Sequence, residues 1–108
     1  MTANQREQVE VRLFKVLNEI EKQHHVSKSY PPDMLPFADQ MKQIHEYIEL
    51  AGEYGVAYES LVASIEMFPF VLPGKVAISL LELGLLLGYK TDRKDDGPFD
   101  RRHGPSET

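Results

Sequence analysis

The chain contains no cysteine among its 108 residues. Disulfide bonds, thiolate zinc sites and cysteine nucleophiles are therefore excluded. A long hydrophobic run is missing too: the most apolar stretch, residues 76–87, has nine apolar residues in twelve and is interrupted by Glu82, whereas a membrane span needs about 18 or more. The first twelve residues carry four charged side chains, where a signal peptide would be apolar. We therefore expect a cytoplasmic protein without a membrane segment.

Residue patterns that enzymes use for chemistry are also scarce. Gly74 and Lys75 lack the glycine spacing and the serine or threonine of a phosphate-binding loop. His45 and Glu49 are four residues apart and could share a metal ion, but no second histidine or cysteine completes a ligand set. We therefore expect no enzyme activity, no cofactor and no metal. A small metal-dependent enzyme remains an alternative only if His45 and Glu49 meet ligands from elsewhere in the fold.

The composition is that of an ordinary folded domain, with 42% apolar and 27% charged residues. A chain of this length can bury one core and has too little surface for a second. No stretch of useful length alternates between apolar and polar residues as a strand would, and apolar residues recur instead at spacings of three and four. We therefore predict an all-α fold, a small bundle of about four helices.

The pattern predicts helices near residues 4–24, 37–51, 56–68 and 75–87. We expect Asn4 to cap the first helix, with Glu7 in the capping-box position, and Gly52 to end the second in the left-handed conformation. The fourth helix is apolar nearly all round, so we expect it to be the central one. The inward-facing residues predicted for the first three helices are Val9, Leu13, Val16, Leu17 and Ile20; Phe37, Met41, Ile44, Ile48 and Ala51; and Val56, Ala57, Leu61, Val62, Ile65 and Phe68.

Composition changes sharply near the end of the chain, where residues 90–108 contain one large apolar residue, Phe99. We therefore predict a single helical domain over residues 1–91 and a polar tail over residues 92–108 that is a loose extension or disordered. The apolar loop at residues 68–72 is either a dimer contact or a lid on the core, so the oligomeric state stays open.

Negative charge is concentrated in the middle of the chain. The net charge is −5, and residues 33–88 hold eight acidic and only two basic residues. Glu46, Glu49 and Glu53 share one face if the helix continues through them. Such a face either keeps the protein soluble or binds a positively charged partner. Tyr54 and Tyr58, a residue type common in interfaces, lie beside acidic residues. Direct nucleic-acid binding is disfavoured, because it requires a basic face.

The segment at residues 45–66 contains Tyr47, Ile48, Glu49, Ala51, Gly52, Glu53, Ala57, Glu59 and Leu61, which form the pattern YIExAGExxxAxExL. This pattern resembles the MafI-type family of bacterial immunity proteins, which includes the immunity proteins of some contact-dependent growth inhibition systems. A weaker likeness extends over residues 80–91, so roughly half of the chain is covered.

The resemblance implies a cytosolic protein that has no activity of its own and neutralises the C-terminal toxin domain of a large secreted effector. Toxins paired with such proteins are commonly nucleases, so we expect a basic RNase, EndoU-like or tRNA-targeting. The alternative is a helical adaptor or regulatory subunit for another basic protein, and neither function involves direct nucleic-acid or membrane binding. The residues expected to contact the toxin are Glu46, Glu49, Glu53, Tyr54, Tyr58 and Glu59.

Overall fold

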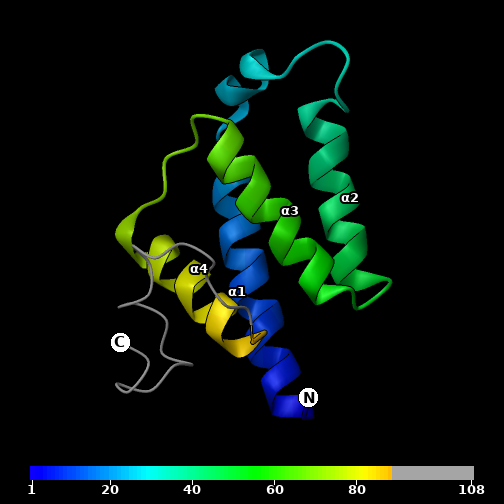
Figure 1. Ribbon diagram of the computed structural model, residues 1–108, viewed down its shortest axis with the longest axis vertical. Helices are drawn as coiled ribbons and strands as arrows, with labels where there is room; N and C mark the ends of the chain where they lie inside the picture. Colours follow the sequence, from blue (N-terminus) through cyan, green and yellow to red (C-terminus); the bar gives the residue numbers. More distant parts are fainter. Residues whose placement is uncertain (89–108) are drawn as a thin grey trace, which may run out of the picture.

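The computed structural model describes residues 1–88 and is helical throughout its regular elements, with no strand in that range (Figure 1). This confirms the predicted all-α bundle of about four helices. The boundary expected at residue 91 and the tail expected over residues 92–108 lie outside the described residues. The elements in chain order are α1 (Ala3–Glu21), the short 3₁₀ helix η1 (His24–Ser29), α2 (Phe37–Glu49), α3 (Tyr54–Met67) and α4 (Gly74–Leu86).

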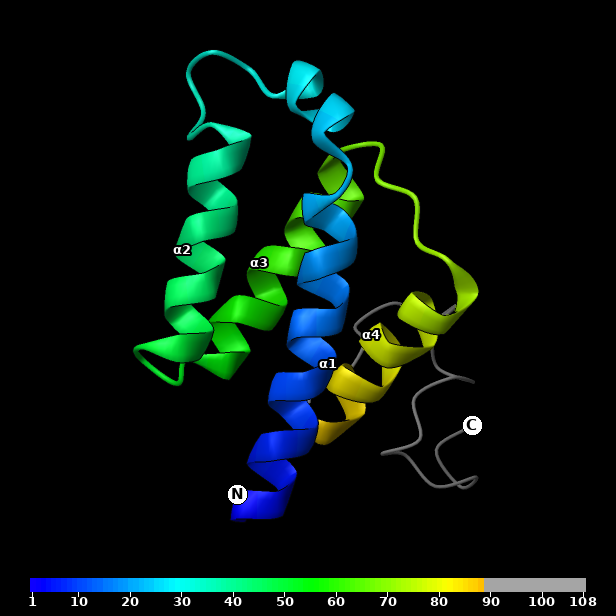
Figure 2. The same ribbon diagram turned by 180° about the vertical axis from the view of Figure 1, so that it is seen from behind.

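The central helix is α1, which contacts α2, α3 and α4. Seen from behind, α1 runs in front of α3, with α2 on one side and α4 on the other (Figure 2). Its predicted apolar stripe is confirmed. Spacings of three and four keep these side chains on one side of the helix, which faces the core. All five of these side chains are fully buried: Val9, Leu13, Val16, Leu17 and Ile20.

The expectation that α4 is central is wrong. This helix packs mainly against α1, and its outer side remains open, with Ile78 and Leu81 58% and 62% exposed. Its buried residues include Val76 and Leu83, which lie on the opposite side. An apolar composition therefore did not indicate how many sides of the helix are covered, since coverage depends on which other helices pack against it.

The residue that caps α1 lies two residues before the predicted cap. Thr2 is the cap: its side-chain oxygen accepts a hydrogen bond from the Gln5 backbone N–H at 3.1 Å, and the Thr2 N–H donates to Gln5 Oε1 at 2.9 Å. This reciprocal pair is a capping box. The expected roles of Asn4 and Glu7 are therefore wrong, because both already lie within the helix.

Helices α2 and α3 form an antiparallel hairpin around a tight turn. In α2 the predicted inward residues Phe37, Met41, Ile44 and Ile48 are buried, but Ala51 is exposed because the helix ends at Glu49. The turn passes through Gly52, whose φ of 61° confirms the predicted left-handed stop.

The third helix begins at Tyr54, earlier than predicted. Ala57, Leu61 and the capping residue Phe68 are buried as expected, whereas Val56 is exposed. A polar residue, Ser64, takes part in the core instead, and its hydroxyl donates to the Ser60 carbonyl at 2.9 Å. This hydrogen bond removes the cost of burying the hydroxyl.

Aromatic side chains close the end of the bundle that is remote from the α2–α3 turn. Phe68 stacks on Tyr30 with ring centroids 3.8 Å apart. Phe37 lies edge-on to Tyr30 at 5.7 Å and near Phe70 at 6.1 Å. Phe70 and Leu72 pack against the core. The loop at residues 68–72 therefore covers the core, which agrees with its interpretation as a lid.

Replacing Gly52 with alanine should destabilise the protein by about 1 kcal/mol, the usual cost of the left-handed conformation for a residue with a Cβ. No atom lies within 4 Å of where that Cβ would be placed, so backbone strain is the only expected penalty. Urea unfolding measures the change. A Gly52→Ala variant as stable as the wild type would contradict the assigned turn geometry, and Gly74→Ala, where φ is not positive and a Cβ also meets nothing, is the matched control.

Candidate functional site

The residues expected to bind a toxin lie in the α2–α3 hairpin, from the last turn of α2 through the connecting turn to the second turn of α3 (Figure 1). The acidic side chains are exposed: Glu46 and Glu49 near the end of α2, Glu53 in the turn and Glu59 in α3. They do not share one helix face, because α2 stops at Glu49. The Glu53 N–H instead donates to the Tyr47 carbonyl at 2.7 Å, which folds the chain back towards α3.

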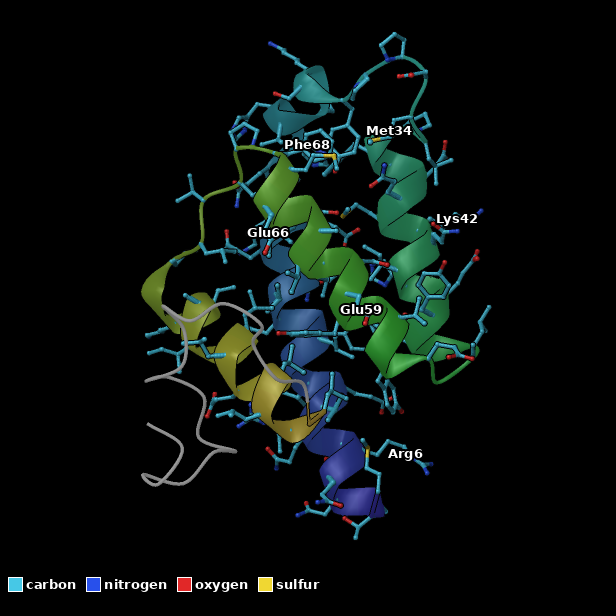
Figure 3. The ribbon with its side chains drawn as sticks, viewed as in Figure 1. Arg6, Met34, Lys42, Glu59, Glu66 and Phe68 are labelled. Carbon is cyan, nitrogen blue, oxygen red and sulfur yellow. The ribbon has the colours of Figure 1, made fainter. Side chains whose placement is uncertain are left out.

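The acidic residues point to different sides of the hairpin. Figure 3 shows Glu59 and Glu66 on the outer side of α3. Glu49 lies on the side of α2 that adjoins α1, where its Oε1 is 3.4 Å from His45 Nδ1. The other ring nitrogen, Nε2, is 2.8 Å from Oε1 of Glu21 in α1. The carboxylates therefore lie on different sides of the hairpin rather than forming a flat patch.

His45 links two carboxylates that approach opposite edges of its ring. Burial lowers the pKa of His45, but hydrogen bonds and charge interactions with Glu21 and Glu49 outweigh this and raise the pKa above 6.5. The two oxygens bind different ring nitrogens and so do not converge on a single point. Among residues 1–88, no group of three or more potential ligands is arranged to hold a metal ion.

The two tyrosines expected at the interface contribute to contacts between helices. The Tyr54 hydroxyl donates to Glu10 Oε2 in α1 at 3.0 Å. Burial raises the pKa of Tyr54, the hydrogen bond and charge of Glu10 raise it further, and Arg6 lowers it. Tyr58 lies against α4, since a Cβ on Gly84 would be 2.8 Å from the Tyr58 hydroxyl oxygen. Both rings are half-buried, so the surface offers a partner mainly carboxylates.

Two acidic residues of α1 belong to the same region and were not predicted. Glu10 is hydrogen-bonded to Tyr54 of α3, and Glu21 is hydrogen-bonded to His45 of α2. They are eleven residues apart, close to three helical turns, so they lie on the same side of α1. The spacing of Glu10 and Glu21 can be read from the sequence. Which helices pack beside that side of α1 cannot. Glu10 and Glu21 are about 16 Å apart along α1 and contact different parts of the hairpin. We use the name acidic end for these two carboxylates together with those around the α2–α3 turn: Glu10, Glu21, Glu46, Glu49, Glu53 and Glu59.

An uncharged groove adjoins the acidic end between α2 and the second half of α3. Its volume is roughly 270 Å³, and the lining includes Met34, Gln43, Ser60, Met67 and Phe68. Met34 and Phe68 mark its upper end in Figure 3. Met67 is exposed along this groove. The hairpin therefore presents carboxylates at its turn and a neutral, partly apolar surface further along.

No protein family, curated protein or solved structure matches this chain. Within residues 1–88, none of the helices combines the length and the hydrophobicity needed to span a membrane.

The His45 contacts should make part of the stability depend on pH. A pKa that is higher in the folded state favours folding below the unfolded pKa of about 6.5, and the benefit disappears as the pH rises through the folded pKa. We therefore expect the stability lost in His45→Gln to be larger at pH 5.5 than at pH 8.5, measured by urea unfolding. Lys42→Gln, an exposed change on the same helix, controls for general charge effects. An equal loss at both pH values would contradict the charged bridge.

Proposed function

We propose that the chain is an immunity protein that acts in the cytoplasm by binding the toxin domain of a secreted effector. The observation that carries this proposal is the acidic end, where four carboxylates of the α2–α3 hairpin are exposed and two carboxylates of α1 contact the hairpin through Tyr54 and His45. Glu46 and Glu49 are three residues apart in α2 and repel each other, so their proximity costs stability in the isolated protein. A positively charged partner removes that cost.

A nuclease fits this surface because its substrate groove must be basic to hold phosphates. Exposed carboxylates such as Glu46, Glu53 and Glu59 can take the places of phosphates and so block the groove. Opposite charges also speed the encounter of two proteins. Rapid association is what protection of a cell from a toxin requires. The neutral groove along α2 and α3 offers the apolar contact area that holds such a complex together.

The resemblance at residues 45–66 supports the same proposal. Those residues build the end of α2, the turn and most of α3, which is the part of the chain that carries four of the six carboxylates. Within the motif, Gly52 and Ala57 have structural roles, since Gly52 allows the turn and Ala57 is fully buried. Glu49, Glu53 and Glu59 are the charged residues of the motif, and all three are exposed.

The test is to produce the chain together with the C-terminal domain encoded by the adjacent upstream gene, and to assay that domain for RNase activity. We expect a one-to-one complex and loss of nuclease activity when the chain is added. A complex in which the nuclease stays active would support the adaptor alternative. The absence of any complex with a demonstrably toxic neighbouring domain would contradict the proposal.

A further inference from the structure

The outer face of α4 is apolar and is not covered by any described element. Gly74, Ile78, Leu81 and Leu85 follow one another at spacings of four, three and four, which places them in one line along the helix. Ile78 and Leu81 are among the most exposed large apolar side chains of residues 1–88. Because α4 packs mainly against α1 with its other side, this line of residues forms a free seam between three and four turns long.

Opposite charges lie along one edge of this seam. Lys75 is exposed, and Glu82 stands seven residues later, two helical turns along the same edge. The Glu82 side chain is 46% exposed, and its Oε1 is 3.3 Å from Arg12 Nε in α1. That ion pair fixes the carboxylate at the margin of the seam and leaves part of it open to a second cation.

The spacing makes the seam complementary to itself. When two identical helices pack antiparallel around a two-fold axis, each side chain at an edge keeps its edge and reverses its height. Lys75 of each copy then lies level with Glu82 of the other, and Ile78 of one copy lies within about 3 Å in height of Leu81 of the other. A parallel two-fold arrangement would instead place these side chains of the two copies on opposite edges of the seam, so the Lys75–Glu82 pairs would not form.

We propose that the chain forms a symmetric dimer through the outer face of α4, with the two α4 helices antiparallel. A second copy fits better than a basic toxin, because the seam itself carries no acidic residue. It also fits better than the end of the same chain, since residues 90–108 contain one large apolar residue, Phe99, too few to cover the seam. Since α4 and α2 lie on opposite sides of α1 (Figures 1 and 2), the dimer leaves both acidic ends accessible.

Mass measured by light scattering across concentrations tests the proposal. We expect the wild type to rise from 12.3 kDa towards twice that mass. The midpoint should lie at about 10–100 µM, because two helices of this length bury less than the roughly 1,600 Å² of a standard interface. Leu81→Asp should remain monomeric. Val11→Asp is the matched control, since Val11 is 60% exposed on α1 and off the seam, against 62% for Leu81. Circular dichroism checks that each variant is folded.

Because the native chain has no cysteine, disulfide trapping tests the antiparallel arrangement even if an aspartate variant unfolds. Gly74→Cys carrying an affinity tag is mixed with untagged Leu85→Cys under mild oxidation, because these two seam positions lie near each other in the antiparallel dimer, whereas identical positions lie more than about 10 Å apart along the helix axis. We expect the mixed disulfide in clear excess over random pairing of the two chains.

Four results would overturn the proposal. The first is a wild type that stays monomeric at every concentration. The second is a Leu81→Asp variant that dimerises as the wild type does. The third is a preference for disulfides between identical positions. The fourth is association at this face only after a toxin domain is added, which would assign the seam to the toxin.

Discussion

Reversing two charges of the acidic end should abolish protection without unfolding the protein. In Glu46→Lys/Glu53→Lys, two exposed carboxylates become cations. Against a basic groove this places like charges together, which costs several kcal/mol. Since about 1.4 kcal/mol corresponds to a tenfold change in affinity, we expect at least about 100-fold weaker toxin binding. Inhibition of the cognate nuclease by a titrated variant measures the effect.

The matched control for this variant is Asp33→Lys/Glu66→Lys, which changes the net charge by the same amount. Asp33 precedes α2 and Glu66 lies near the end of α3, so both are exposed at the opposite end of the hairpin. This control should inhibit nearly as well as the wild type, with a small loss in association rate from the altered overall charge. Full inhibition by the Glu46/Glu53 variant, or equal losses in both variants, would remove the acidic end as the binding site. Unchanged helical circular dichroism is required of both.

The largest expected effect on stability is that of Leu13→Ala. Leu13 is fully buried in α1, the helix that contacts the three others. Removing a buried leucine side chain costs the transfer of its atoms and leaves a cavity, about 3 kcal/mol in total. This is a large share of the roughly 5–15 kcal/mol that stabilises a typical domain. Urea unfolding at a fixed protein concentration measures the change.

The control for Leu13→Ala is the same substitution at Leu50, which is 81% exposed. It should change the free energy of unfolding by less than about 0.5 kcal/mol. A Leu13→Ala variant that is as stable as Leu50→Ala would contradict the central position of α1.

Features set by local periodicity were predictable from the sequence. The apolar stripes of α1 and α2 were identified because burial on one side of a helix imposes a repeat of 3.6 residues. Gly52 was identified because a left-handed turn residue is most often glycine. The helix boundaries were less accurate: the Thr2 cap was missed because Asn4 and Glu7 offered similar chemistry two residues later.

Features that depend on which helices meet were not predictable. Whether Tyr54 faces a partner or the protein itself is decided by Glu10, which is 44 residues away. The position of Tyr58 is likewise decided by Gly84, where the absence of a side chain makes room for the ring. The sequence showed that α4 is apolar nearly all round. It did not show that another helix covers only one side of α4. For the candidate site, sequence located the acidic residues of the hairpin and missed those contributed by α1.

The central position of α1 also determines how the native structure opens. Because α4 rests mainly on α1, it can detach as a unit while α1, α2 and α3 keep their mutual contacts. No comparable partial opening frees α1, since removing it takes away the packing partner of each other helix. Backbone amides in the middle of α1 therefore exchange with solvent only through global unfolding. We expect those of α4 to have a second route, the local detachment of this helix, which leaves the hairpin with its acidic end folded.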